Sequence, residues 1–360
     1  MLGRVIEWFV FNAQHRKIRR QFAANLGYAG DFENPTTFQE KVQFRKLYGN
    51  HDFYALVADK YRVRNYVASR VGEQHLIPLL GAYARLDESI FKALPQQFII
   101  KANHGCKWNE VVYDKSKLDI QNTVRRFNKL CTRRYGWRAG ERHYNFIPPV
   151  IVIEELLRGK DGGLPWDYSF FCYRGPNRFD YTFSIGSPDG RTAGFDKDWT
   201  PLAGKIPAIE LAPHMKPANF AEMVQVATTL SADFDFVRVD LYSVGDKVYF
   251  GELTCTPHQG YGVIENKLRQ KICDDLWQLD SGNPLLYKPP RSHRIALSTP
   301  SRPPVPFPAV ALDSERHITK LTNLRKYTVL CAMSVLQKYL PARLPPERKT
   351  NCINQPERQT

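Results

Sequence analysis

The pattern of apolar and polar positions predicts a chain of mixed helices and strands. Apolar residues recur at helical spacing over residues 1–25 and lead into a basic group at residues 16–20. The segment 30–75 is predicted to be helical with polar faces, beginning after Asn34, where a following threonine can cap the first turn. Residues 220–230 also have helical spacing. The fold class that follows is α+β.

Several segments have the pattern of β-strands. Short apolar runs at 97–101 and 150–155 are bounded by turn residues and predict buried strands. Alternating aromatic and polar residues over 167–183 predict a hairpin. A second hairpin is predicted from the alternation at 236–242 and 247–253, with a glycine turn between the two strands.

The composition changes after residue 285. Eleven of the 25 prolines lie in residues 286–360, which predicts a Pro-rich linker or tail with one helical segment at about 318–340. We therefore expect three parts: a basic amphipathic helix at 1–29, a folded body at 30–285, and the Pro-rich basic tail at 286–360.

The net charge of +15 is concentrated at the two ends of the chain. Residues 1–25 carry five Lys or Arg against one Glu, and residues 286–360 carry thirteen against four acids. A nucleic-acid enzyme would more usually have its basic stripe on the folded body, so we expect no nucleic-acid partner. Basic ends suit an anionic membrane face or polymer. The N-terminal helix is expected either to pack on the body with its basic end in solvent or to lie on a membrane surface.

The seven cysteines are scattered and contain no C-x-x-C pair, which favours a reducing compartment and argues against a structural zinc site. No run of 18 apolar residues and no signal-peptide pattern is present in the sequence. The expected location is cytoplasmic, with peripheral attachment at the inner face of the cell membrane as a further option.

The most informative chemistry lies on the second predicted hairpin. Side chains repeat every two residues along a strand, so Arg238 and Asp240 share one face, and Glu252 and Thr254 share a face of the returning strand. A short turn would bring these faces opposite each other. Two carboxylates, a hydroxyl and an arginine suit Mg²⁺ bridging phosphates. The alternative is a surface hairpin with cross-strand charge pairs.

Two weaker signals accompany this hairpin. Lys101 ends an apolar strand and opens into a turn at 103–109, an arrangement that can bind phosphate through an ammonium group and loop N–H groups. Glu154 and Glu155 end another strand, and because successive side chains alternate, one can meet a ligand while the other faces solvent. Each signal alone is also explained by an ordinary strand end.

Taken in order, Ala58-Asp59-Lys60, the strand-end Lys101, Ile153-Glu154-Glu155 and R-x-D…E-x-T at 238–254 resemble the ATP-grasp arrangement. The chain is most similar to the teichuronopeptide-synthesis (TupA-like) type of ATP-grasp protein. The segments that carry this resemblance span about residues 34–260 and include NPTTFQEKVQFRKLY, LPQQFIIKANHG and FDFVRVDLYSVGDKVYFGELTCTP. The resemblance implies an ATP-grasp fold, in which two α+β subdomains grip ATP.

The resemblance also implies roles for the phosphate-binding residues. Lys60 and Lys101 would contact the ATP phosphates. The turn that contains His104, Gly105 and Asn109 would be the loop over them. The loop differs from relatives at Cys106-Lys107, where small residues are common, and the roles of these two residues stay undetermined.

For the rest of the nucleotide, the resemblance implies a hinge and a ribose contact. Glu154 would meet the adenine amino group, and backbone from Glu155 to Leu157 would complete the hinge. Asp167 stands where an acid usually binds the ribose.

The same resemblance makes Asp240, Glu252 and Thr254 the Mg²⁺ ligands, with Thr254 in the usual asparagine position. Arg238 would stabilise the transferring phosphoryl group, so Arg238, Asp240 and Glu252 are the expected catalytic residues. His258 stands where a glycine is common, and its role is undetermined.

The implied function is a Mg·ATP-dependent carboxylate–amine ligase that acts through an acyl phosphate in cell-surface polysaccharide biosynthesis. Its partners would be ATP, a carboxylate-bearing saccharide or polymer acceptor, and an amine donor. One alternative is a glycosyltransferase, because Asp233-Phe234-Asp235 is formally a D-x-D motif. A second alternative is a non-enzymatic module that binds a membrane or polyanion through its basic ends.

Overall fold

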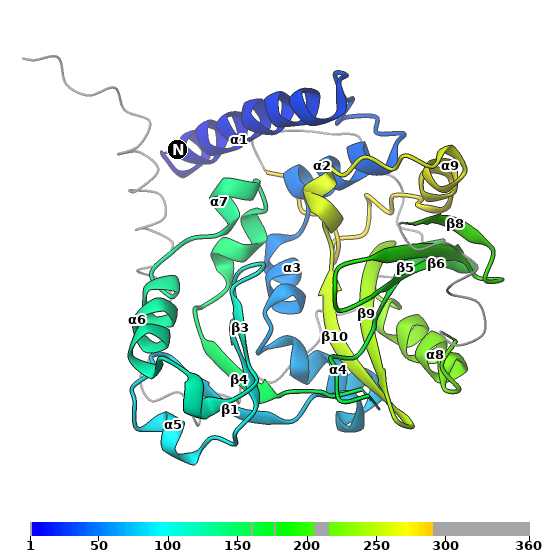
Figure 1. Ribbon diagram of the computed structural model, residues 1–360. Coiled ribbons are helices and arrows are strands. Elements are labelled where there is room, and N and C mark those ends of the chain that lie inside the picture. The colour runs from blue at the N-terminus through cyan, green and yellow to red at the C-terminus, as the bar shows by residue number, and fades with distance from the viewer. Residues whose placement is uncertain (1, 160, 176–177, 205–215, 291–360) are drawn as a thin grey trace, which may run out of the picture. The chain divides into compact units, whose positions relative to one another are not determined.

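A computed structural model describes residues 2–159, 161–175, 178–204 and 216–290, which form one body with two antiparallel sheets and surrounding helices (Figure 1). The predicted α+β class is confirmed. The Pro-rich tail from residue 291 onward, with the helix expected at 318–340, lies outside the described residues. Among the helices that are described, none has both the length and the apolar character needed to cross a bilayer.

The helical segments predicted at 1–25 and 30–75 are present. Their helices are α1 (Leu2–Leu26), α2 (Phe38–Tyr48), α3 (His51–Ala58) and α4 (Val63–Val71). Thr37 caps α2 with a capping box, in which its side chain accepts the Glu40 N–H and the Glu40 carboxylate accepts the Thr37 N–H. The expectation of polar faces fails for α2, because all eleven of its residues are buried. Its polar side chains are bonded inside the protein.

The helix α1 packs on the body along one face. Phe11, Ile18 and Phe22 on that face are buried in the main core. Gln14 donates to the Gly140 carbonyl over 3.1 Å, and the Lys17 ammonium donates to the Trp137 carbonyl over 2.6 Å. The packed arrangement expected for this helix is therefore present, and its outer face carries the exposed residues considered below.

The smaller sheet has four strands in the order β1-β4-β2-β3. They are β1 (Leu79–Tyr83), β2 (Phe98–Ala102), β3 (Asn109–Val112) and β4 (Ile151–Glu155). The helices α5 (Ile90–Ala93) and α6 (Ile120–Leu130) contribute Phe91 and Phe127 to a separate core against this sheet. The apolar runs predicted as buried strands are β2 and β4, the two central strands.

The larger sheet has six strands in the order β10-β9-β5-β6-β7-β8. They are β5 (Asp167–Gly175), β6 (Arg178–Gly186), β7 (Thr192–Asp196), β8 (Pro201–Gly204), β9 (Phe236–Val244) and β10 (Lys247–Thr254). Both predicted hairpins, β5–β6 and β9–β10, are therefore confirmed. Helix α8 (Phe220–Leu230) packs its buried residues on one face of this sheet (Figure 1), which leaves the opposite face for the polar side chains of β9 and β10.

The segment after α4 connects the two sheets. Leu76 forms a parallel bridge with Phe250 of β10, and the His75 ring contacts the Val248 carbonyl through Nδ1 at 2.9 Å. Leu79 then begins β1 of the smaller sheet. The edge of the larger sheet and the start of the smaller sheet are thus linked by a few consecutive residues.

Arg45 of α2 lies at the centre of the polar interior. It is 1% exposed, and its Nη1 donates to the carbonyls of Phe236 (2.8 Å) and Cys255 (2.9 Å). Its Nη2 pairs with the buried Asp235 carboxylate, and its guanidinium lies 4.5 Å from the Trp277 ring centroid. Asp235 immediately precedes β9 and Cys255 immediately follows β10, so one guanidinium fixes both ends of this hairpin.

The second oxygen of Asp235 binds the C-terminal end of the body. It accepts the Tyr287 hydroxyl over 2.7 Å and the Asp280 N–H over 3.0 Å. Leu286 and Tyr287 are buried in the main core. The packed body therefore extends at least two residues beyond the boundary predicted at 285.

Replacement of Arg45 by Met should destabilise the protein by about 3–5 kcal/mol, because it leaves the Asp235 carboxylate buried without its cation. The measurement is the free energy of unfolding in urea. The matched control is Arg126→Met, which removes an ion pair with Glu110 in which the Arg126 side chain is 45% exposed, and which should cost about 1 kcal/mol or less. Equal losses for the two variants would contradict a central role for Arg45.

Candidate active site

The pairing of β9 with β10 brings the predicted catalytic residues together. Glu252 lies opposite Asp240, and Thr254 lies opposite Arg238. This pairing depends on a register shift between Phe250 and Glu252, at Gly251. With uninterrupted register, Glu252 would pair with Val239 and point into the core under α8, because a shift of one residue moves a side chain to the other face. The bulge at Gly251 therefore places the second carboxylate in the site.

Gly251 is required by the space around it. A Cβ at this position would lie 3.0 Å from the Asp240 carbonyl oxygen and 3.1 Å from the Tyr242 ring. The carbonyl belongs to the backbone of the partner strand and cannot move without disturbing the pairing. The alternation seen in the sequence predicted which residues share a face on each strand, but it did not predict this bulge.

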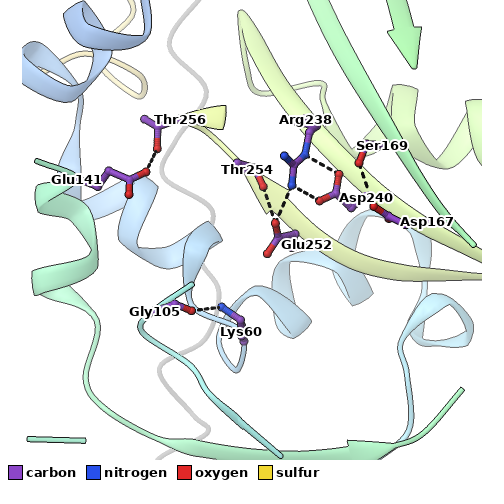
Figure 2. A network of polar contacts seen from close by, with 10 residues as sticks. All are labelled: Lys60, Gly105, Glu141, Asp167, Ser169, Arg238, Asp240, Glu252, Thr254 and Thr256. Carbon is purple, nitrogen blue, oxygen red and sulfur yellow. Dashed lines mark hydrogen bonds and ion pairs between the residues drawn. The ribbon is translucent and has the colours of Figure 1, made fainter. Parts of the chain in front are cut away.

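Arg238 binds both carboxylates of the hairpin (Figure 2). Its Nε and Nη2 donate to the two oxygens of Asp240 over 2.7 and 2.5 Å, and Nη2 also donates to Glu252 Oε1 over 2.8 Å. The Thr254 hydroxyl donates to the same Glu252 oxygen over 2.9 Å. The convergence predicted for these four residues is present.

Asp167 adds a third carboxylate from the neighbouring strand. It begins β5, beside β9, and its Oδ2 accepts the Ser169 hydroxyl over 3.2 Å. Its Oδ1 is buried and has no hydrogen-bond partner among the described residues. The structure places Asp167, the acid that the resemblance assigns to the ribose, beside the Arg238–Asp240 pair (Figure 2).

The carboxylates of this cluster repel one another. Burial raises the pKa of Asp240 to about 8, with repulsion from Asp167 and Glu252 adding to the rise and Arg238 opposing it. Burial likewise raises the pKa of Asp167 to about 6. Burial also works to raise the pKa of Glu252, but Arg238 and Lys60 outweigh it and the pKa is lowered. Three carboxylates share one guanidinium, and a further cation would relieve their repulsion.

Lys60 faces this cluster from the turn between α3 and α4. It follows Asp59, whose buried carboxylate accepts the N–H groups of Tyr61 and Arg62 and so shapes the turn after α3. The Lys60 ammonium donates to the Gly105 carbonyl over 2.8 Å (Figure 2). Burial lowers its pKa, while attraction to Glu252 opposes that shift. The charges of Lys60 and Glu252, the predicted phosphate-binding lysine and the predicted metal-binding acid, therefore influence each other.

The turn after β2 is anchored at its first residue. The Asn103 side chain accepts the Val150 N–H over 2.8 Å and donates to the Pro148 carbonyl over 2.9 Å. His104 is 2% exposed and packs edge-on against Trp108, so its ring contributes to packing. At Gly105 a Cβ would lie 2.4 Å from the Trp108 ring, which explains the glycine.

The remaining loop residues face outward. Asn109 is exposed and pairs with Lys101 at the start of β3. Cys106 is exposed, and Lys107 has a left-handed backbone with φ 58°. His258, after β10, is also left-handed with φ 48° and exposed. These contacts give no specific role to the last three residues.

The predicted adenine contact, Glu154, lies in an ion-pair network. It is 5% exposed and accepts Lys101 Nζ over 2.6 Å and Arg64 Nη1 over 2.8 Å. Glu155 is exposed, as alternation along a strand requires, and Leu157 is half-buried beyond the strand end. Arg64 was missed in the sequence because no motif marks it; it lies at the start of α4, shortly after Lys60.

The residues present fit Mg²⁺ with bound phosphates. No three His, Cys, Asp or Glu side chains in the described ranges form a metal cage by themselves. Mg²⁺ in nucleotide sites uses one or two carboxylates and completes its shell with phosphate oxygens and water. Asp240 and Glu252 supply those carboxylates, Asp167 adds an unpartnered oxygen nearby, and Lys60 adds positive charge for phosphates.

Several solved structures resemble the chain weakly. D-alanine–D-alanine ligase from Helicobacter pylori aligns at 14% identity and TM-score 0.38 over 62% of each chain. The ADP complex of N5-carboxyaminoimidazole ribonucleotide synthetase aligns at 11% identity and TM-score 0.36, over 58% of this chain and 47% of that one. D-alanine–D-alanine ligase from Bacillus anthracis, complexed with ATP, aligns at 14% identity and TM-score 0.33, over 60% of this chain and 61% of that one. The chain thus spans less than two thirds of these proteins, and such alignments carry no argument about activity.

The family comparison is decisive. No curated protein matches the sequence. The family model described as TupA-like ATPgrasp matches residues 40–276, which is more than half of the chain and includes every residue of the site. The chain therefore belongs to the TupA-like ATP-grasp family.

Proposed function

We propose that the protein is a Mg·ATP-dependent carboxylate–amine ligase that acts through an acyl phosphate in cell-surface polysaccharide biosynthesis. The observation that carries this proposal is the cluster of Asp167, Asp240 and Glu252 around Arg238, with Lys60 facing it. Burying two of these acids beside a single guanidinium is unfavourable in isolation, and such arrangements concentrate at functional sites.

The first step would phosphorylate the acceptor. A carboxylate oxygen of the acceptor attacks the γ-phosphorus of ATP, a new O–P bond forms, and the bond to the β-phosphate oxygen breaks to release ADP. Bound Mg²⁺ neutralises phosphate charge in this chemistry. Asp240 and Glu252 would bind the ion, and Lys60 would bind phosphate oxygens.

Arg238 would act on the transferring group. Its guanidinium is already fixed by bonds to Asp240 and Glu252, so little reorganisation is needed to face a phosphoryl group beside these acids. Phosphoryl transfer depends mainly on positioning and charge neutralisation. The amine donor then attacks the acyl carbon, a C–N bond forms, and inorganic phosphate leaves with the electron pair of the broken C–O bond.

The D-x-D motif at 233–235 does not support the glycosyltransferase alternative. The D-x-D acids are both buried and both paired: Asp233 with Arg70 and Asp235 with Arg45. Asp233 also accepts the Tyr66 hydroxyl over 3.0 Å. These carboxylates stabilise the fold away from the cluster around Arg238, so they offer no site for a metal and a sugar diphosphate.

The resemblance to the teichuronopeptide-synthesis type makes a uronic-acid-containing saccharide or polymer, or its lipid-linked precursor, the proposed acceptor. An amino acid or amino sugar is the proposed amine donor. An acceptor of this kind is anionic, and the basic termini of the chain complement it in charge.

We place the enzyme in the cytoplasm, with α1 as a peripheral contact at the inner membrane face. Val5, Trp8 and Phe9 are 45%, 45% and 58% exposed near its start. At helical spacing Val5 and Phe9 share a face with the exposed residues Arg16 and Arg20, opposite the face that packs on the body, and Trp8 lies at the edge of that exposed face. Exposed aromatic residues followed by arginines are typical of helices that lie on anionic membranes.

Substitution of Asp240 or Glu252 by Ala should lower Mg-dependent ATP turnover by about a hundredfold or more, because each would remove a charge that binds the metal. Turnover is measured as ADP release with glucuronate, galacturonate and polygalacturonate as carboxylates, and with the common amino acids and glucosamine as amines. Asp246→Asn, in the exposed turn of the same hairpin, is the control and should retain activity.

The melting temperature of the same protein discriminates between nucleotides. ATP with Mg²⁺ should raise the melting temperature of the wild-type protein, because a ligand that binds only the folded state stabilises it, and UDP-sugars should not. Stabilisation by a UDP-sugar without any effect of Mg·ATP would sink the ligase proposal, as would wild-type turnover in both alanine variants.

Gly251→Ala should weaken Mg·ATP binding by about tenfold or more, because the added methyl group meets the Asp240 carbonyl and disturbs the bulge that aligns Glu252. The readout is the Mg·ATP concentration needed to raise the melting temperature. Gly175→Ala is the matched control, since a Cβ there meets nothing closer than 3.7 Å. Equal nucleotide affinity in both variants would show that the bulge is not required.

Trp8→Ser combined with Phe9→Ser should reduce binding to phosphatidylglycerol vesicles by about tenfold or more, since burying one large apolar side chain contributes roughly 1.5 kcal/mol or more. Co-sedimentation with vesicles measures this. Val263→Ser with Leu268→Ser is the control, because both residues are exposed apolar positions outside α1. Unchanged sedimentation of the Trp8/Phe9 variant, or no sedimentation of the wild type, would refute the membrane contact.

A further inference from the structure

A fourth acid, Glu141, lies on the other side of Glu252 from the Asp167–Asp240 pair (Figure 2). It stands between α7 (Gly136–Ala139) and the short helix η3 (Arg142–Phe146) and is 5% exposed. One of its oxygens accepts the hydroxyl of Thr256, two residues beyond Thr254. After burial, the charge of Glu252 also acts to raise the pKa of Glu141.

This carboxylate has no cation bonded to it in the described part of the chain. The nearest candidate, Lys46 of α2, directs its ammonium elsewhere: it donates to the Gln259 carbonyl over 3.0 Å and to the Tyr261 hydroxyl over 3.2 Å. Lys46 also lies 4.3 Å from the Tyr261 ring centroid. A carboxylate that is shielded from water without a bonded cation is unfavourable unless a ligand completes it.

The segment that carries Glu141 is held in place by contacts with α1. Gly140 has a left-handed backbone with φ +69°, and a Cβ there would lie 3.3 Å from Ile18 of α1. The carbonyl of Gly140 accepts Gln14 of α1, and that of Trp137 accepts Lys17. Two bonds from α1 thus fix the backbone directly before Glu141, which makes the placement of its side chain a property of the fold.

Burial and the titratable groups around Glu141 together set the pKa of its carboxyl group. Burial raises its pKa to about 7, with Glu252 adding to the rise and Thr256 and Lys46 opposing it. Burial lowers the pKa of Lys46 to about 7, and Lys17 of α1 contributes to that shift. The other ionisable neighbours are three tyrosines and a thiol, and burial, with a smaller contribution from Glu141, raises the pKa of each: Tyr135, Tyr144, Tyr261 and Cys255. They stay protonated and neutral at pH 7.

We propose that Glu141 binds the amine co-substrate and accepts the proton that the amine loses in the amide-forming step. This inference rests on the proposed ligase function. An ammonium group would supply the cation that the Glu141 carboxylate lacks. One proton would pass to Glu141, and the freed nitrogen lone pair would attack the acyl carbon to form the C–N bond. The C–O bond to the phosphate would then break, and the departing phosphate would take the second proton from the nitrogen. A base that titrates near the working pH is suited to this transfer.

The other acids of the site are less suited to this role. Asp167 has one oxygen without a hydrogen-bond partner among the described residues, but it lies beside the Arg238–Asp240 pair (Figure 2). Both oxygens of Asp240 and one oxygen of Glu252 bind Arg238. Glu154 is occupied by Lys101 and Arg64. Glu141 has a hydroxyl as its partner, and Thr256 can orient the carboxylate without neutralising it. It is the acid placed beside the metal-binding strand and outside the Arg238 cluster.

The test compares two nucleophiles in the full-length enzyme. Hydroxylamine is uncharged at neutral pH and can trap an acyl phosphate as a hydroxamate without a base, whereas amino acids and glucosamine arrive as ammonium ions. In Glu141→Gln, which keeps the shape of the side chain, the loss of amide formation with the amine mixture should exceed the loss of hydroxamate formation by about a hundredfold. The difference should narrow at higher pH, where more amine is already neutral.

Equal losses with both nucleophiles at every pH would overturn the proposal and leave Glu141 a structural residue. Absence of hydroxamate with the wild-type enzyme would instead refute the acyl-phosphate mechanism, so the two failures are distinguishable. Should Glu141→Gln fail to fold, Thr256→Val provides the second test. It keeps the carboxylate but removes its hydrogen bond, and it should raise the KM for the amine mixture far more than that for hydroxylamine; equal changes would again overturn the assignment.

Discussion

The buried pair of Arg45 with Asp235 is the interaction on which the rest of the structure depends. Asp235 lies at the entry to β9 and Cys255 at the exit from β10, and Arg45 binds both positions from α2. The four site residues of the hairpin lie between these two points. Because a guanidinium can donate in several directions within one plane, it can bind two carbonyls and a carboxylate at once. A buried helix with a polar sequence thereby becomes the support of the active hairpin.

The hairpin in turn concentrates charge in a way that the protein alone does not balance. Asp167, Asp240 and Glu252 surround one arginine, and burial raises the pKa of the first two. The free energy stored in this repulsion is released when positive charge arrives. A site built in this way would bind Mg²⁺ with its nucleotide more favourably than a neutral site would, because the cation would relieve repulsion that exists before binding.

Much of this fold and part of this site could be predicted from the sequence. Strands β2, β4, β9 and β10 were recognisable because their apolar pattern has the period of a strand, and the same period predicts that Arg238 and Asp240 share a face. The bulge at Gly251 could not be predicted, because it depends on what lies across the sheet. The burial of the polar residues in α2 was missed for the same reason: their partners, such as Asp235, are distant in sequence.

Glu141 was the least accessible residue to sequence reasoning. No motif surrounds it, and its position is set by α1, more than a hundred residues away, through Gln14 and Lys17. This connection gives α1 two faces with different tasks. Its inner face fixes the segment that would receive the amine, while its outer face presents Trp8 and the arginines proposed to meet the membrane. A lipid-linked acceptor would then be held beside the same helix that orients the base, so membrane attachment and amide formation would depend on one element of the fold.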